Sequence, residues 1–220
     1  EDNKWEVNCP SAKLLADAAR EFNMWIVGGS VPERVIVKGN GDNQKESIYN
    51  TCLCINPQGQ IVAKHRKVHL FDIDVPGKIT FKESDTLSPG GGLTSFDAGP
   101  PFGMIGVGIC YDIRFPELSQ CLAKRGCKII IFPGAFNLTT GPAHWELLQR
   151  ARAVDNQCYI LTASPARTEP PLEEEDLKYP HYTAWGHSTA VNPWGEVIAT
   201  CDDNESIVIV DLDMGRVDEV

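Results

Sequence analysis

The chain has 220 residues, of which 42% are hydrophobic and 23% are charged, and its formal net charge is −10 at pH 7. This composition is that of a globular protein large enough for one sizeable core, so we predict a single domain over residues 1–220. The acidic charge repels phosphate backbones, so we expect no nucleic-acid partner. The apolar stretches are far shorter than the roughly 20 residues of a membrane span, so we expect no membrane partner.

The eight cysteines are scattered through apolar segments and do not form the loop-rich spacing of a disulfide framework. Reduced, mostly buried thiols are typical of a cytoplasmic protein. We therefore expect a cytoplasmic location, with the mitochondrion as the alternative.

The first part of the chain predicts a helix, a strand and a hairpin. Apolar residues recur at spacings of three and four over 11–23, which predicts an amphipathic helix. The apolar run at 24–28 then predicts a buried strand. Two further strands, at 48–56 and 60–65, flank the turn sequence at 57–59 and should pair as a hairpin.

The periodicity fails over 68–92, which predicts a long ordered loop of the kind that often covers a functional site. Strands and helices then alternate, which favours an α/β fold. The predicted strands lie at 93–96, 104–109, 128–132 and 159–163, and the helices at 116–125 and 143–155. Three strands at 188–192, 197–200 and 207–210 close the chain, after an acidic run at 173–176 that we expect to be a solvated loop.

The segment from Gly106 to Glu117 carries the clearest chemical signal. An apolar strand ends at Cys110, a short turn follows, and Pro116 stands where a helix should begin. A cysteine at such an elbow becomes a nucleophile when a nearby cation or a helix N-terminus favours its thiolate. A buried structural cysteine is the competing interpretation, and this segment alone does not decide between the two.

Two further segments bear on that choice, one at 65–71 (His-Arg-Lys-Val-His-Leu-Phe) and one at 132–137 (Phe-Pro-Gly-Ala-Phe-Asn). Together with the elbow, they resemble the nitrilase superfamily of carbon–nitrogen hydrolases over essentially the whole chain. The stretches 71–81 and 133–156 resemble its omega-amidase branch. The resemblance implies a four-layer α-β-β-α sandwich, truncated at the N-terminus and slightly at the C-terminus relative to the family.

The resemblance also implies the site residues. Cys110 matches the family nucleophile, Lys67 the catalytic lysine, and Glu83 a second glutamate found near the site. The substrate-binding positions would be Tyr111, Arg114, Phe136 and Asn137. For Arg114 a structural salt bridge with Asp112 is an equal alternative.

The family's first catalytic glutamate follows its first strand, upstream of the helix at 11–23, and no matching segment occurs there. Pro32-Glu33 follows the strand at 24–28 and therefore stands in the wrong order. We expect the full protein to carry this glutamate outside the numbered chain, and the numbered chain to be weakly active or inactive without it.

The resemblance implies an omega-amidase that converts substrates such as 2-oxoglutaramate or 2-oxosuccinamate to the dicarboxylate and ammonia through a cysteine thioester. The alternatives are a related amidase for deaminated glutathione, an N-carbamoyl compound or an aliphatic amide, and an inactive fragment that acts as an interaction protein. The resemblance also implies a homodimer. Amide hydrolysis needs no cofactor, so we expect none.

Two other histidine-based sites are weaker hypotheses. A papain-like hydrolase would need a histidine paired with the thiol, for which His144 is the candidate. His65 and His69 are four residues apart, as zinc ligands on a helix can be, but Lys67 between them would repel a cation. We therefore predict no metal site.

Overall fold

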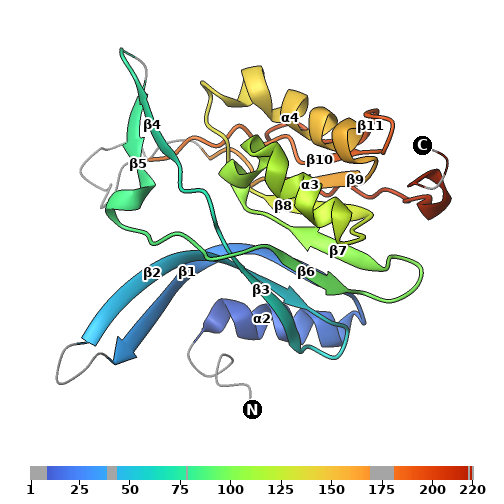
Figure 1. Cartoon of the computed structure of the whole chain (residues 1–220), viewed down its shortest axis with the longest axis horizontal. Helices are drawn as coiled ribbons and strands as arrows, with labels where there is room; N and C mark the ends of the chain where they lie inside the picture. The colour runs from blue at the N-terminus through green and yellow to red at the C-terminus, as the bar shows by residue number, and fades with distance from the viewer. Residues whose placement is uncertain (1–8, 39–43, 78, 169–180, 218, 220) are drawn as a thin grey trace.

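The structure is a computed structural model that describes residues 9–38, 44–77, 79–168, 181–217 and 219. Two sheets lie face to face, with helices on both outer sides (Figure 1). One sheet has the strand order β1-β2-β3, and the other has the order β11-β10-β9-β8-β7-β6. The acidic run at 173–176 lies outside the described residues.

The three-stranded sheet is antiparallel and carries one helix on its outer face. Its strands are β1 (Ile26–Lys38), β2 (Gln44–Ile55) and β3 (Ile61–Arg66), and the helix is α2 (Pro10–Glu21). Ala12 and Ala19 of α2 pack against Leu53 and Ile55 of β2. The small alanines allow the helix to approach the sheet closely, so the predicted amphipathic helix and the β2–β3 hairpin are confirmed.

The six-stranded sheet combines a parallel centre with antiparallel edges. Strands β7, β8 and β9 run parallel, and β6, β10 and β11 are added antiparallel. The strands are β6 (Thr94–Asp97), β7 (Met104–Val107), β8 (Ile129–Pro133), β9 (Tyr159–Ala163), β10 (Thr189–Val191) and β11 (Val197–Thr200). The helices on its outer face are α3 (Pro116–Lys124) and α4 (Gly141–Asn156).

Successive side chains of one strand point to opposite faces of its sheet and enter different hydrophobic cores, one between the two sheets and one under the helices. Cys52 and Cys54 point between the sheets, where they join a cluster that includes Val107 and Ile129. Side chains on the opposite face of β8, Ile130 and Phe132, pack under α3 and α4. Because central segments such as 52–55 and 129–132 are buried on both faces, they are apolar at successive positions. The predicted α-β-β-α sandwich of the α/β class is confirmed.

Three predicted segments differ from the structure. The first strand continues through β1 to Lys38 rather than ending near Gly28. The predicted loop at 68–92 contains a hairpin of β4 (Asp72–Val75) and β5 (Ile79–Lys82), followed by a 3-10 turn, η1 (Glu83–Asp85). The predicted strand at 207–210 is wrong, because no described strand pairs with it, and Ile207 and Ile209 are both 88% exposed.

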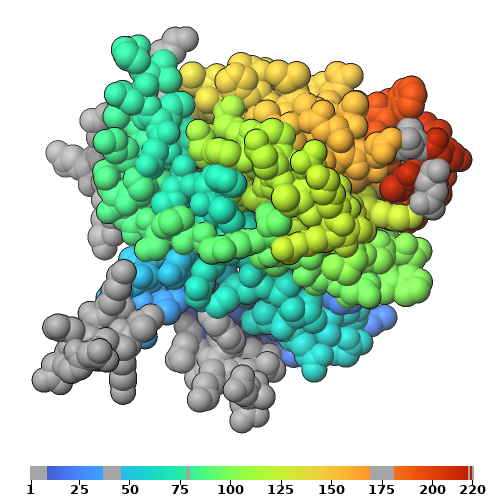
Figure 2. Space-filling model, in the orientation of Figure 1, coloured from blue at the N-terminus to red at the C-terminus, as the bar shows by residue number. Residues whose placement is uncertain are grey.

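The β4–β5 hairpin stands at one edge of the molecule, beside the helices of the larger sheet (Figure 2). Both of its strands are only four residues long, which leaves no buried face to create an apolar period. At the other end of the described chain, Met214–Val217 forms a further 3-10 turn, η4. Among the described residues, no helix has the length and apolar character needed to cross a membrane.

Candidate active site

Cys110 lies at a sharp elbow between β7 and the 3-10 helix η2 (Cys110–Arg114). Its φ is +48°, the left-handed region that a residue with a side chain rarely adopts. Such strain costs about 1–3 kcal/mol and is concentrated at functional sites. Gly134, directly after β8, makes the elbow possible, since a Cβ there would lie 2.7 Å from the Cys110 Cα. The elbow predicted from the sequence is confirmed.

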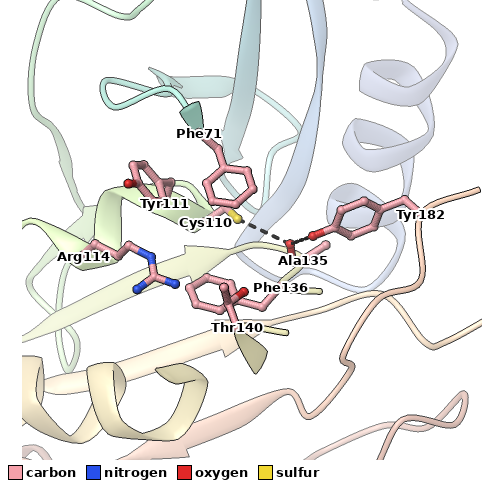
Figure 3. A pocket seen from close by; sticks show the side chains of 8 residues that line it. All are labelled: Phe71, Cys110, Tyr111, Arg114, Ala135, Phe136, Thr140 and Tyr182. Atoms are coloured by element: carbon pink, nitrogen blue, oxygen red, sulfur yellow. Dashed lines mark hydrogen bonds between the residues drawn. The ribbon is translucent and has the colours of Figure 1, made fainter. Parts of the chain in front are cut away.

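Two adjoining hollows meet at Cys110. Both are lined by Phe71, Cys110, Ala135 and Tyr182. The first also contacts Tyr111, Arg114, Phe136 and Thr140 (Figure 3). The second also contacts Ser30, Asn50, Lys67, Phe81, Glu83, Ile109 and Gly134. The thiol therefore has the lysine and glutamate on one side and the arginine on the other.

Lys67 and Glu83 form a buried ion pair in the second hollow. The Lys67 Nζ lies 2.5 Å from the Glu83 Oε2, and the two side chains are 3% and 10% exposed. The backbone N–H of Phe71 also donates to the Glu83 Oε2, at 2.7 Å, and the Asn50 amide donates to the Oε1 at 3.4 Å. Glu83 thus fixes the ammonium of Lys67 on the pocket wall beside Cys110.

The Cys110 thiol donates to the carbonyl of Ala135 at 3.6 Å. The Tyr182 hydroxyl donates to the same carbonyl oxygen at 2.8 Å (Figure 3). Burial raises the pKa of the Cys110 thiol above its ordinary value, and the nearby Lys67 only partly offsets that effect. The expectation that a cation favours the thiolate is therefore incomplete. Burial outweighs the effect of the lysine, so the net shift in pKa works against the thiolate.

Arg114 points into the first hollow without an acidic partner. Its guanidinium lies 5.0 Å from the Phe136 ring and 5.6 Å from the Tyr111 ring, and its Nη2 is 3.2 Å from the His144 Nδ1. None of the described carboxylates pairs with it, because Asp112 binds elsewhere. Burial lowers the pKa of Arg114, as expected for a half-buried cation with no carboxylate beside it in the described part of the chain.

The remaining predicted positions divide into two groups. Tyr111 and Phe136 line the first hollow. Asn137 does not line either hollow: its Oδ1 accepts hydrogen bonds from the Thr139 and Thr140 backbone N–H groups at the start of α4. The wall residues Phe71 and Thr140 lie within the resembling segments 65–71 and 133–156 but were not predicted as site residues, and Tyr182 lies outside those segments.

The two histidine hypotheses fail on geometry. His144 faces Arg114, so it is not paired with the thiol as a papain-like mechanism requires. His65 and His69 both contact Asp112, at 3.0 and 2.8 Å. Within the described residues, no group of three or more potential metal ligands is found.

The fold and this site define a class that the comparisons with known proteins identify. The model of the carbon–nitrogen hydrolase family matches residues 2–220, and the chain belongs to that family. The omega-amidase NIT2 of Bos taurus is 54% identical to it over 210 residues, which are 96% of this chain and 69% of the relative. The human omega-amidase NIT2 is 52% identical over the same shares. The predicted branch of the family is therefore confirmed.

Two solved structures share the fold of this chain. Nit3 of Saccharomyces cerevisiae, a member of branch 10 of the nitrilase superfamily, matches with a TM-score of 0.77 and 40% identity, over 96% of this chain and 67% of its own. The NitFhit protein of C. elegans matches with a TM-score of 0.80 and 35% identity, over 98% of this chain and 48% of its own.

Proposed function

We propose that the protein is an omega-amidase that hydrolyses the terminal amide of small keto-dicarboxylic acid monoamides, such as 2-oxoglutaramate and 2-oxosuccinamate. One observation carries the proposal. Cys110 lies between the Lys67–Glu83 ion pair and the unpaired guanidinium of Arg114, so the pocket has a nucleophile with a cation on each side. A substrate with an amide at one end and a carboxylate at the other fits that order.

In the first half of the reaction, the Cys110 sulfur attacks the amide carbon and the carbonyl oxygen becomes an oxyanion. The Lys67 ammonium and the backbone N–H of Tyr111 stabilise this oxyanion. As the sulfur attacks, a general base takes the thiol proton and then passes it to the nitrogen, so the carbon–nitrogen bond breaks and the nitrogen leaves as ammonia. The product on the enzyme is a thioester.

In the second half, a general base takes a proton from water, and the resulting hydroxide attacks the thioester. The carbon–sulfur bond breaks, which releases the carboxylate product and restores the thiol. The resemblance assigns this base to the family's first glutamate, upstream of the matched segments. We assign Glu83 to holding and orienting Lys67, because its Oε2 is the acceptor for the Lys67 ammonium.

The far end of the substrate would bind at Arg114. The guanidinium is held between aromatic faces, so it can turn two parallel N–H groups toward a carboxylate. Tyr111 and Phe136 would then cover the short carbon chain between the two ends. We keep Asn137 as an indirect contributor that shapes the loop between Phe136 and Thr140.

Cys110→Ala in the protein expressed from its complete reading frame tests the proposal. The variant should release no ammonia from 2-oxoglutaramate, while Cys121→Ala, at an exposed cysteine, should match the wild type. Undiminished release by Cys110→Ala would overturn the mechanism. If the wild type hydrolyses N-carbamoyl compounds or uncharged amides and not 2-oxoglutaramate, the related-amidase alternative is correct.

The interaction-protein alternative predicts no turnover of any amide and no selective reaction at Cys110. An amide-like electrophile that labels Cys110 in preference to the other cysteines would exclude it. We also propose a homodimer, which the resemblance implies, and a cytoplasmic location, which the scattered thiols favour. Sedimentation equilibrium and cell fractionation test these two points.

A further inference from the structure

Asp112 is a fully buried carboxylate that contacts both segments carrying the catalytic residues. We propose that Asp112 is a positioning residue that fixes the placement of the Lys67 ammonium relative to the Cys110 thiol. The inference rests on the proposed function for its consequence in catalysis, but its geometry stands independently.

On the lysine side, Asp112 binds residues on both sides of Lys67. The His65 Nε2 lies 3.0 Å from the Asp112 Oδ2. The backbone N–H of His69 donates to the Oδ1 at 2.9 Å, and the His69 Nδ1 lies 2.8 Å from the same oxygen. Lys67 is midway between the two histidines. Asp112 therefore anchors the chain at the residue two positions before Lys67 and at the residue two positions after it.

On the cysteine side, the same carboxylate closes the elbow. The backbone N–H of Ile109 donates to the Asp112 Oδ2 at 2.9 Å, and Cys110 lies between these two residues in the chain. This bond spans the residue whose φ is +48° and therefore helps to hold its strained backbone. One side chain thus connects the strained nucleophile to the segment that carries Lys67, directly after β3.

The negative charge of the Asp112 carboxylate strengthens its hydrogen bonds to the two segments. Burial raises the pKa of Asp112, but the hydrogen bonds from His65 and Ile109 outweigh it, so the net pKa is lowered and the group stays ionised. Hydrogen bonds to a buried carboxylate are stronger than those between neutral groups. All four hydrogen bonds of the Asp112 carboxylate go to the segment around Lys67 or to the elbow at Cys110. A shift of either segment would therefore leave the buried carboxylate with fewer hydrogen-bond donors.

Two outer contacts support the histidines. The His69 ring stacks on Phe115, which follows the elbow, with 3.6 Å between ring centroids and 9° between planes. The His65 Nδ1 lies 3.0 Å from the Thr94 Oγ1. Each imidazole is therefore held on both sides, and Asp112 is the point at which they meet.

The principal test is Asp112→Asn, which keeps the shape of the side chain but places an NH₂ group against one pair of donors. Because a misplacement of about 1 Å can cost on the order of 10²-fold in rate, we expect kcat for 2-oxoglutaramate to fall at least about 10-fold. KM should change less than about 3-fold, since Asp112 does not line either hollow. Alkylation of Cys110 by iodoacetamide should slow as well.

A matched control separates placement from stability. Thr162 is buried, and its hydroxyl donates to Gln149 on α4, far along the chain from both catalytic segments. Thr162→Val should lower the temperature of unfolding and leave kcat and the alkylation rate within about 2-fold of the wild type. Both variants are assayed below their unfolding temperatures.

His69 provides a second test if Asp112→Asn does not fold. His69→Leu removes the side-chain donor, whereas His69→Asn keeps a donor near the position of the Nδ1. We expect His69→Leu to lower kcat and slow alkylation, and His69→Asn to restore most of both.

The proposal is overturned if folded Asp112→Asn keeps kcat and alkylation within 2-fold of the wild type. It is also overturned if Asp112→Asn is unfolded and His69→Leu and His69→Asn behave alike. If the wild type releases no ammonia from any amide, the proposed function fails. The alkylation rates would then still decide whether Asp112 positions Cys110.

Discussion

The ammonium of Lys67 and the carboxylate of Glu83 lie 2.5 Å apart on a pocket wall, although 16 residues separate them in the chain. Lys67 follows β3, and Glu83 begins the 3-10 turn after the β4–β5 hairpin. The β4–β5 hairpin therefore brings Glu83 back beside the end of β3, where its carboxylate meets the Lys67 ammonium. Their burial makes the pair costly to break, because either charge alone would lose both water and its partner.

Glu83→Gln should destabilise the protein and lower its activity together. The amide keeps the size of the side chain but leaves the Lys67 ammonium uncompensated, so we expect a loss of about 3–5 kcal/mol in the free energy of unfolding. Urea unfolding measures it. The control is Glu146→Gln, whose carboxylate is 63% exposed and 3.4 Å from Arg150, and it should change the free energy by less than about 1 kcal/mol. Equal effects would contradict the prediction.

Gly134→Ala should disturb the nucleophile directly. The added Cβ would lie 2.7 Å from the Cα and 2.9 Å from the Cβ of Cys110, so one of the two backbones must move. We expect a cost of about 1–3 kcal/mol, as for other overpacked sites, and slower alkylation of Cys110. At Gly91 a Cβ meets nothing within 4 Å, and Gly91→Ala should leave the alkylation rate unchanged. Unaltered alkylation in Gly134→Ala would show that the elbow tolerates the shift.

Arg114→Met should separate acidic from neutral substrates. A hydrogen-bonded carboxylate at a cation is worth about 1.5–3 kcal/mol, so kcat/KM for 2-oxoglutaramate should fall roughly 10- to 100-fold. An amide of similar length without the carboxylate provides the internal control, and its kcat/KM should stay within about 3-fold. Parallel losses for both substrates would mean that Arg114 supports the pocket wall without binding the carboxylate.

The sequence predicted those elements of the fold that are buried on two faces. Segments such as 52–55 and 129–132 are apolar at every position, because alternate side chains enter different cores. The β4–β5 hairpin has no such pattern, since Phe81 is 47% exposed and neither strand covers a core. At 207–210 the opposite error occurs: a continuous run of β-branched apolar residues is present, but a strand also needs a partner, which no local pattern reveals.

Some residues of the site could be predicted from the sequence, and others are revealed only by the structure. Cys110, Lys67 and Glu83 were found through motifs that resemble a family, and the structure brings all three to one pocket. Tyr182 reaches that pocket from a segment with no periodic pattern, so only the tertiary structure reveals it. Asp112 looked like a partner for Arg114 two residues away, but its partners His65 and His69 are 47 and 43 residues distant.

Glu33 should make the stability depend on pH in the acid range. Its carboxylate accepts hydrogen bonds from Lys64, Arg66 and Thr51, and the side chain is 4% exposed. Burial acts to raise its pKa, but these bonds outweigh burial and lower the pKa from 4.5 to about 2. A lowered pKa means that the unfolded chain binds a proton more readily than the folded one.

The stability from Glu33 is therefore fully present above its unfolded pKa and is lost as the pH falls toward about 2. Glu33→Gln removes this proton uptake. We expect the free energy of unfolding of the wild type to fall more steeply with acid than that of Glu33→Gln, as measured by urea unfolding at several pH values. The control is Glu46→Gln, at an exposed ion pair with Arg34, and its acid dependence should stay close to that of the wild type. If the curves of the wild type and Glu33→Gln run parallel below about pH 4, the Glu33 carboxylate does not hold its low pKa in the folded protein.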